Sequence, residues 1–366
     1  MYYYTSTDTM CKVLSGAKLF ATNLGYMNDS HEYIHGLRTV KKVLEDKGIP
    51  ENENFSFSNI NEYVYGEKEL TYFSISFCKD GDLLSQWTTY ARESGVSIEM
   101  SFVEGQELAF EIESYDKDGI KIFAQPKEIV YVEGKWERLE SKKESVLKLL
   151  DSEGKDTNEG RDYFISAGSK ASAYIKQADF VQEREFRIVF DVAVMKNVPK
   201  IEYRVDKHVI KPYLSVKCMD GWPVTAITVG PGFNQGIVFQ SVKYFLNHAK
   251  IEACSLITKK QWKDQIKAYF QEGGEKLQDI WKEMEADKDS DFIAEWNGLE
   301  DAPGEKIGEV EKKKWSQSIV RAIKSKIRKQ AGSAESIQEK YREYVGEYCF
   351  TMSGIILRKS EIPYIY

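Results

Sequence analysis

Two segments in which apolar and polar side chains alternate constrain this sequence more than any other feature. In Tyr72–Cys78 (YFSISFC) the serines occupy every second position between large apolar residues. In Glu183–Phe190 (EREFRIVF) the apolar residues alternate with Glu183, Glu185 and Arg187. A period of two residues is that of a β-strand, whose successive side chains point to opposite faces. The chain is therefore expected to build a sheet with one buried face and one polar face.

The segments around these strands indicate an α+β protein. Tyr2-Tyr3-Tyr4-Thr5 reads as a short strand, and Thr7 or Asp8 is expected to cap a helix that ends near Gly16. Further strands are predicted at 18–23, 96–102, within 108–133 and around 227–229, and further helices at 33–46, 83–91 and from the 230–232 turn to about 247. Residues 47–66 read as a loop, and 134–178 as mostly helix and connection.

The C-terminal third has a different character. Residues 258–350 are strongly helical and charged, and an acidic stretch at 283–311 precedes a basic helix at 312–329. Apolar residues recur every fourth position on that helix, and the last residues read again as strand. We therefore expect an α+β core at 1–257, a helical insertion at 258–350 and a C-terminal strand within 351–366 that returns to the core.

Composition limits the classes of function. The formal charge of −7 argues against a surface that coats nucleic acid throughout, and no apolar run is long enough to cross a membrane. The N-terminus does not have the pattern of a secretion signal. The five cysteines are scattered and form no Cys-x-x-Cys pair, so neither a disulfide framework nor a zinc ribbon is indicated. A cytoplasmic location is expected, and the composition predicts no particular oligomeric state.

A set of short motifs occurs in an order that resembles a known bacterial family. The motifs are Tyr3-Tyr4-Thr5, Asn28-Asp29-x-x-Glu32, Trp87-x-x-Tyr90-Ala91, Glu183-x-Glu185-x-Arg187, Val229-Gly230-Pro231 and Ser360-Glu361-Ile362-Pro363. Together they resemble the family called domain of unknown function 2971, over residues 1–250 and the last dozen. The resemblance implies an architecture and, through the family's setting, a role in toxin or antiphage biology.

A second resemblance concerns chemistry. One branch of the ADP-ribosyltransferases carries an early polar residue on a first strand, a Ser-x-Ser strand and a later Glu-x-Glu strand. The chain offers Tyr4-Thr5, Ser74-Ile75-Ser76 and Glu183-Arg184-Glu185 in that order, but not the Arg or His those enzymes carry at the first position. The resemblance implies split antiparallel sheets with flanking helices, and NAD as co-substrate.

The residues of this second resemblance suit cleavage of a nicotinamide–ribose bond. Positive charge grows on the sugar in the transition state, and a nearby carboxylate such as Glu185 stabilises that state more than the ground state. Glu183 can orient the incoming nucleophile, and Ser74 or Ser76 can position Glu185. Tyr4, Thr5, Asn28, Asp29, Glu32, Trp87, Tyr90 and Arg187 complete the expected binding residues. Trp87 or Tyr90 is expected to stack on nicotinamide.

His31-Glu32-Tyr33-Ile34-His35 supports a rival interpretation, because H-E-x-x-H on a helix places two imidazoles toward one metal. A zinc-dependent hydrolase using His31 and His35 is the alternative enzyme. Both histidines fall outside the apolar stripe of their helix, and no third ligand is identifiable, so a metal is not favoured. Asn28 and Asp29 can equally be caps of the helix, with Glu32 closing a capping box.

Two further possibilities remain open. The chain can be a non-catalytic nucleotide-sensing or partner-binding domain whose polar cleft holds a nucleotide without chemistry. The basic helix at 312–329 can contact the phosphates of a nucleic-acid acceptor, contact a protein acceptor, or pair with the acidic stretch before it. A solvated charged face is the ordinary structural interpretation of that helix.

Overall fold

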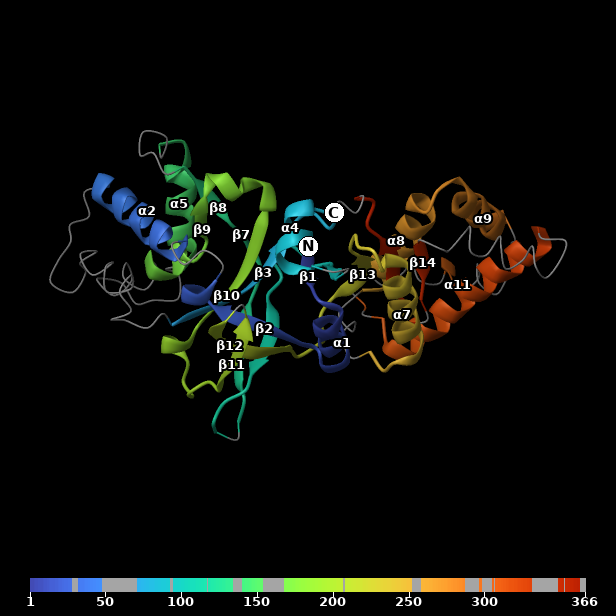
Figure 1. Cartoon of the computed structure of the whole chain (residues 1–366), viewed down its shortest axis with the longest axis horizontal. Helices are drawn as coiled ribbons and strands as arrows, with labels where there is room; N and C mark the ends of the chain where they lie inside the picture. The colour runs from blue at the N-terminus through green and yellow to red at the C-terminus, as the bar shows by residue number, and fades with distance from the viewer. Residues whose placement is uncertain are drawn as a thin grey trace. The chain divides into compact units, whose positions relative to one another are not determined.

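The computed structural model describes residues 1–27, 32–47, 71–92, 95–116, 118–133, 140–153, 168–206, 208–251, 258–286, 296–297, 305, 307–330, 348–351 and 353–362. The chain is α+β and forms two compact units, each assembled from segments distant in sequence (Figure 1). Unit 1 comprises 1–17, 80–103 and 220–366, and unit 2 comprises 18–79 and 104–219. The division falls inside the range 1–257 that we expected to be one core.

The described strands of unit 1 follow the order β14 (Tyr348–Phe350), β15 (Ile356–Lys359), β13 (Val224–Val229), β4 (Val96–Met100) and β1 (Tyr2–Thr5). The β13–β15 pairing is parallel and the others are antiparallel. Every residue of β13 is buried, as expected for a strand covered on both faces. Helix α7 (Gln235–His248) contacts both β13 and β15.

Several motifs that carry the first resemblance meet around the buried Trp87 on α4 (Leu84–Tyr90) of unit 1. The Trp87 indole donates a hydrogen bond of 2.7 Å to Asp82. Asp82 also accepts from the Ser360 hydroxyl at 2.5 Å and from the Glu361 N–H at 2.8 Å. A Cβ at Gly230 would lie 2.6 Å from the Trp87 ring, so only glycine fits this turn. These contacts hold Ser360 and Glu361 against the unit 1 core.

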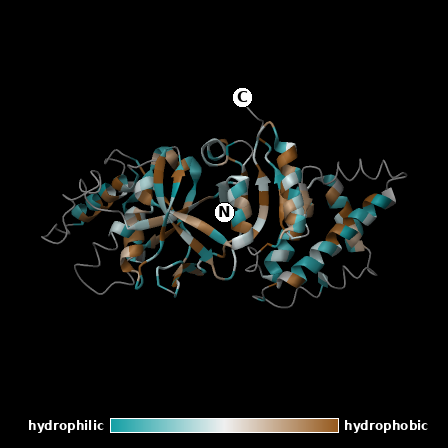
Figure 2. Ribbon diagram, turned by 60° about the horizontal axis from the view of Figure 1, so that its bottom comes forward, coloured by the Kyte–Doolittle hydropathy of each residue, from teal (hydrophilic) through white to brown (hydrophobic). Residues whose placement is uncertain are grey.

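Other helices that the structure describes in unit 1 are α1 (Thr7–Gly16), α8 (Lys259–Glu272), α9 (Glu275–Ala286) and α11 (Glu309–Gln330). Along α11, apolar and polar residues alternate at helical spacing (Figure 2), and Trp315, Ile319, Ile323 and Ile327 are buried. Lys312 is buried against the Trp262 ring, and Lys326 lies 3.6 Å from Glu283 of the acidic stretch. Part of the basic face is therefore used within the chain.

Unit 2 is built on a sheet with the strand order β7 (Lys127–Glu128), β10 (Glu185–Asp191), β3 (Tyr72–Cys78), β2 (Lys18–Asn23), β12 (Val209–Cys218), β5 (Leu108–Ile112) and β6 (Ile120–Ala124). Strand β11 (Ile201–Asp206) pairs with β12 on the side where β5 also joins it. All these pairings are antiparallel.

A second layer of unit 2 carries two helices on a pair of parallel strands. Strands β8 (Val130–Val132) and β9 (Ile175–Gln177) pack with α2 (Glu32–Asp46) and α5 (Glu140–Glu153), and their buried residues form one hydrophobic cluster. A Cβ at Gly36 would lie 2.2 Å from the Ser172 carbonyl oxygen, so glycine permits this close approach of α2 to the segment before β9. The close packing holds Glu32 near β9.

Local patterns predicted most elements, with specific corrections. Strands β1, β2, β3, β4 and β13 and helices α2, α4, α7 and α11 occur where expected. The cap of α1 is Ser6, whose side chain accepts from the Thr9 N–H, and not Thr7 or Asp8. Glu183 is not part of a strand: it ends the 3₁₀ helix η4 (Ala178–Glu183), and β10 begins at Glu185. Local periodicity did not predict β9, β11 or β12.

Candidate functional site

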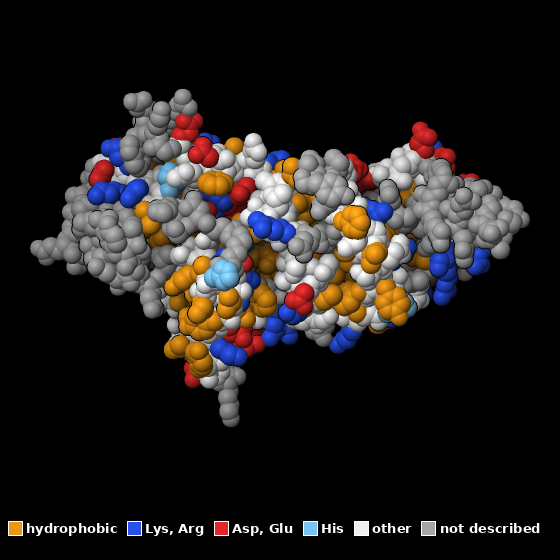
Figure 3. Space-filling view, in the orientation of Figure 1, with side chains coloured by type: hydrophobic (Ala, Val, Ile, Leu, Met, Phe, Trp, Pro, Cys, Tyr) orange, Lys and Arg blue, Asp and Glu red, His pale blue; other side chains and the backbone are white. Residues whose placement is uncertain are grey.

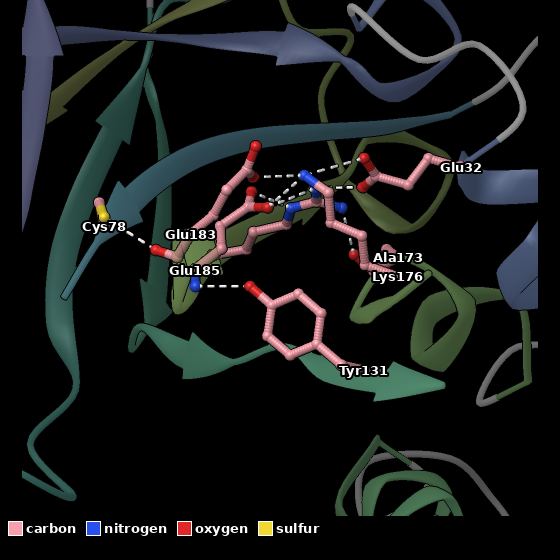
Figure 4. A network of polar contacts seen from close by, with 8 residues as sticks. Glu32, Cys78, Tyr131, Ala173, Lys176, Glu183 and Glu185 are labelled. Atoms are coloured by element: carbon pink, nitrogen blue, oxygen red, sulfur yellow. Dashed lines mark hydrogen bonds and ion pairs between the residues drawn. The ribbon is translucent and has the colours of Figure 1, made fainter. Parts of the chain in front are cut away.

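The candidate site is a cluster of charged side chains inside unit 2. Glu185 and Arg187 come from β10, Lys176 from β9 and Glu32 from the first turn of α2, while Glu183 ends η4 (Figure 4). The chain turns sharply between the two glutamates, because Arg184 adopts the left-handed conformation at φ 42°. This turn lets the Glu183 and Glu185 carboxylates reach the same cation although only Glu185 belongs to the strand.

Arg187 is the centre of the cluster and is 2% exposed. Its Nε lies 2.6 Å from Glu185 Oε1, and its Nη2 lies 3.0 Å from Glu185 Oε2. Nη2 also donates to Glu32, and Nη1 donates to the Ala173 carbonyl at 2.9 Å. A planar guanidinium suits such a fork, so Arg187 is held at several points and not only by charge.

Lys176 joins the three carboxylates. Its Nζ lies 2.7 Å from Glu183, 3.0 Å from Glu185 and 3.3 Å from Glu32, and 4.9 Å from the centre of the Phe180 ring. Three carboxylates and two cations leave the cluster with a formal charge of −1. Buried charges are tolerated only when paired and hydrogen-bonded, and this cluster meets that condition.

The pKa values of Glu183 and Glu185 are shifted in opposite directions. Burial raises the pKa of Glu185, but Arg187 and Lys176 together bring that pKa down to about 2. Burial raises the pKa of the Glu183 carboxyl, and Lys176 only partly opposes the increase. Burial lowers the pKa of Lys176, but Glu185 and Glu32 raise it above its usual value. Glu185 is therefore a fixed negative charge, whereas Glu183 takes up a proton more readily.

The surroundings of the two glutamates also differ. The Glu185 side chain is 7% exposed and that of Glu183 is 20% exposed. The backbone N–H of Glu185 donates to the Tyr131 hydroxyl at 2.8 Å, and the Cys78 thiol donates to the Glu183 carbonyl at 2.8 Å. Figure 4 shows the Tyr131 ring on the opposite side of the Glu185 backbone from the Glu183 carboxylate. Both positions are fixed by backbone contacts.

A groove of about 650 Å³ lies within unit 2, and among its described lining residues there is no member of the charged cluster. Its lining includes Tyr131, Arg184, Lys142, Glu128 and Glu133. The groove is near the cluster through Tyr131, whose hydroxyl accepts a hydrogen bond from the backbone N–H of Glu185. The volume is in the range of small-molecule sites, and the lining offers one aromatic ring with charges of both signs.

The serine-bearing strand lies next to the glutamate strand, as expected. Ser76 is opposite Arg187 and Ser74 is opposite Val189 in the β3–β10 pairing. Within the described part of the chain, neither serine hydroxyl has a hydrogen-bond partner of normal length. The Ser76 hydroxyl is nonetheless near enough to Glu185 to help lower its pKa. Ser76, and not Ser74, is therefore the serine that is placed to orient Glu185.

Four other expected residues belong to unit 1. The Tyr4 hydroxyl donates to the Asp80 carbonyl and accepts from the Leu83 N–H, both at 2.9 Å. Thr5 is buried, and the buried Trp87 ring packs edge-on against Tyr4 with ring centres 4.7 Å apart. The Trp87 ring is therefore a packing element and is not available to stack on nicotinamide. Tyr90 is exposed. Asn28 and Asp29 lie outside the described residues.

The H-E-x-x-H alternative receives no support from Glu32. The Glu32 carboxylate, which would have to activate water, pairs with Arg187 and Lys176. His31 lies outside the described residues, while His35 lies on α2. Among the residues that the structure describes, no group of three His, Cys, Asp or Glu side chains is arranged to hold a metal ion. None of the helices searched in that same part of the chain is long and apolar enough to cross a membrane.

Sequence reasoning missed Lys176, Tyr131 and Arg184. Tyr131 and Lys176 lie opposite each other in the parallel β8–β9 pair, which joins segments 45 positions apart. Local periodicity carries no information about such a pairing. One signal was present: Lys176 directly follows the apolar run Ala173-Tyr174-Ile175, and a lysine buried beside such a run requires an acidic partner.

Comparisons with known proteins found no match from which this site could be identified. No protein-family model, no curated protein and no solved structure matched the chain.

Proposed function

We propose that this chain is an NAD-dependent ADP-ribosyltransferase-like enzyme or NAD glycohydrolase that acts at Glu183 and Glu185 of unit 2. The observation that carries the proposal is the shared contact of these two carboxylates with Lys176, at 2.7 and 3.0 Å. Pairs of carboxyl groups whose surroundings drive their pKa values apart are typical of acid–base and glycosidic chemistry.

The geometry divides the work between the two glutamates. Glu185 is enclosed by Arg187 and Lys176, so its role is to hold the cluster's charge and position Lys176. Glu183 has the more exposed side chain and the raised pKa, so it is the carboxylate that contacts the ribose or the incoming nucleophile. A carboxylate at this place stabilises the positive charge that grows on the sugar. Ser76 supports Glu185 from the neighbouring strand.

The groove beside Tyr131 is the proposed nucleotide site. Arg184 and Lys142 on its wall provide cations for a pyrophosphate, and the Tyr131 ring provides an apolar surface for a base. Arg184 directly follows Glu183 in the sequence. A ligand bound by Arg184 would therefore be held by the residue next to the proposed catalytic glutamate. The adjacent Ser-x-Ser and Glu-bearing strands support the split-sheet fold of this enzyme class.

The biological setting proposed here rests on sequence resemblance. Similarity to the family called domain of unknown function 2971 supports a bacterial toxin or antiphage effector. Five basic residues on α11 of unit 1 are exposed and can contact the phosphates of a nucleic-acid acceptor or an acidic protein: Lys313, Lys314, Arg321, Lys324 and Arg328. Lys312 and Lys326 are committed to contacts within the chain.

Release of nicotinamide from NAD tests the proposal directly. The variants are Glu183→Gln and the matched control Glu144→Gln, an exposed residue of α5. We expect Glu183→Gln to lower the rate at least about 100-fold, the usual effect of removing one group that stabilises transition-state charge. The control should keep the wild-type rate. Wild-type protein that releases no nicotinamide with any acceptor, or unchanged activity in Glu183→Gln, would overturn the enzymatic proposal.

A non-catalytic nucleotide-binding domain is the second candidate, and the enclosure of Glu185 favours it. A carboxylate already bound by two cations is typical of a structural ion pair. This candidate predicts that NAD or a related nucleotide binds without turnover. Calorimetry should then give equal affinity for wild type and Glu183→Gln, and weaker affinity for Arg184→Ala. Nicotinamide release that depends on Glu183 would exclude it.

A further inference from the structure

Strand β11 lies at an edge of the unit 2 sheet. It pairs with β12, and no other strand among the described residues pairs with it. Immediately before β11, the Lys200 N–H donates to the Glu113 carbonyl at 2.7 Å. This backbone contact is therefore made before β11 begins at Ile201. An edge strand presents N–H and C=O groups that can pair with a strand of another chain.

One face of the β11–β12 hairpin is apolar and open to solvent. Tyr203, Val205 and Ile210 are 66%, 74% and 62% exposed. The register places Val205 opposite Ile210 and Tyr203 opposite Pro212, so these side chains form one continuous surface. Figure 3 shows hydrophobic side chains gathered over β11 and β12. Exposed apolar patches of this kind mark sites of association.

The sequence of the edge strand is complementary to itself in the antiparallel direction. Residues 200–206 read Lys-Ile-Glu-Tyr-Arg-Val-Asp. When this segment faces a reversed copy of itself about Tyr203, Glu202 faces Arg204, Ile201 faces Val205 and Tyr203 faces Tyr203. Lys200 and Asp206 face each other at the two ends. Each charge therefore meets an opposite charge, and each apolar residue meets an apolar one.

The charged residues of β11 lie on the face opposite Tyr203 and contact their own chain there. Arg204 donates to the Thr22 hydroxyl at 3.0 Å and stacks over the Tyr213 ring, while Asp206 lies 2.8 Å from Lys211. Glu202 lies 3.9 Å from Lys200. Glu202 and Arg204 are thus held on one polar face. From that face, Glu202 of one copy can pair with Arg204 of the other.

We propose that β11 pairs antiparallel with β11 of a second copy, with the two-fold axis at Tyr203, to form a homodimer with a continuous sheet. A two-fold axis makes the same surface serve both partners, so the self-complementary register is the one such a dimer requires. The apolar faces of both hairpins then join across the axis, and the charges pair on the other face. This inference is independent of the proposed function.

Charge reversal tests the register. E202R and R204E each place like charges opposite one another twice per dimer, and each should weaken the dimer at least about tenfold. The E202R/R204E double variant restores opposite charges and should dimerise like wild type. A mixture of the two single variants should form the heterodimer, because both of its charge pairs are complementary. E104R, a reversal at an exposed turn of unit 2, is the control.

Sedimentation velocity over a concentration series measures these states. Wild-type protein that stays monomeric throughout, or a dimer that all the reversals leave unchanged, would overturn the proposal. Because the wild type, the control and the double variant are compared by the same measurement, a folding defect in one single variant does not decide the outcome.

Cysteine cross-linking gives a second, geometric test. Y203C faces itself across the axis at a Cα separation of about 4.5–5.5 Å, which a disulfide can span. I201C faces Val205 of the second copy and lies roughly 13 Å from its own counterpart. Oxidation should therefore join Y203C to itself, and I201C only to V205C in a mixture. Equal cross-linking of I201C alone and Y203C would show that the register is not the one proposed.

Discussion

Arg187 and Glu185, two positions apart on β10, form a two-point ion pair in the interior of unit 2. The Nε–Oε1 distance is 2.6 Å and the Nη2–Oε2 distance is 3.0 Å. Side chains two positions apart on a strand share a face, so local geometry brings the pair together. Lys176 and Glu32 then enclose it from other elements. The stability of this cluster depends on every member.

Glu185→Gln should lower the free energy of unfolding of the protein by about 3 kcal/mol, because Arg187 and Lys176 remain buried with less compensation. The exposed Glu144→Gln control should change it by no more than about 0.5 kcal/mol. Urea denaturation followed by circular dichroism measures both. Equal stability of the two variants would mean that the cluster is open to water in solution.

Acid should act on the two glutamates with opposite sign. Glu183 has a raised pKa in the folded protein, so its contribution to stability improves as the pH falls through that pKa, above the ordinary value of 4.5. The folded pKa of Glu185 is about 2, below its ordinary value of 4.5. The stability that Glu185 contributes is therefore complete above about pH 4.5 and is lost as the pH falls toward 2.

Denaturation midpoints measured between pH 7 and pH 2 separate these effects. The loss of stability as the pH falls below 4.5 should be smaller in Glu185→Gln than in wild type. The gain of stability as the pH falls toward 4.5 from above should be absent in Glu183→Gln. A wild-type midpoint that does not fall between pH 4.5 and pH 2 would contradict the low pKa of Glu185.

Gly36→Ala should destabilise the protein although alanine is the better helix former. The new Cβ would lie 2.2 Å from the Ser172 carbonyl oxygen, and relieving this overlap should cost about 1–3 kcal/mol. Gly236→Ala on α7 is the matched control, because nothing lies within 4 Å of its Cβ position. That control should be neutral or stabilising by up to about 1 kcal/mol. Thermal unfolding should rank the control above wild type and Gly36→Ala below it.

Asp82→Ala should loosen the segment that contains Ser360 and Glu361 in unit 1. It removes the acceptor of the buried Trp87 indole, and of Ser360 and Glu361, which should cost about 1–3 kcal/mol. Hydrogen exchange at the Glu361 amide should become faster. Asp264→Ala, at an exposed site on α8, should leave that amide unchanged. Unaltered exchange in Asp82→Ala would show that other contacts hold this segment.

The sequence by itself determined the local elements. Alternation predicted β3 and most of β10, and helical spacing predicted α2 and α11, because side-chain direction within one element follows from backbone geometry alone. The expectation that Glu183 extends the strand of Glu185 was wrong, since the left-handed Arg184 interrupts the extended backbone. The periodicity of apolar residues does not reveal that one residue adopts a left-handed backbone conformation.

Tertiary structure decided which acids became a cluster. Glu32 and Arg187 are 155 positions apart, and Lys176 lies on β9, a short strand that pairs with β8, where Tyr131 stands 45 positions earlier. Two alternating strands fix which residues share a face, but only packing of the second layer decides that this face is covered and which cations enter it. The low pKa of Glu185 follows from that enclosure, because burial strengthens its pairing with Arg187 and Lys176 and removes competing water.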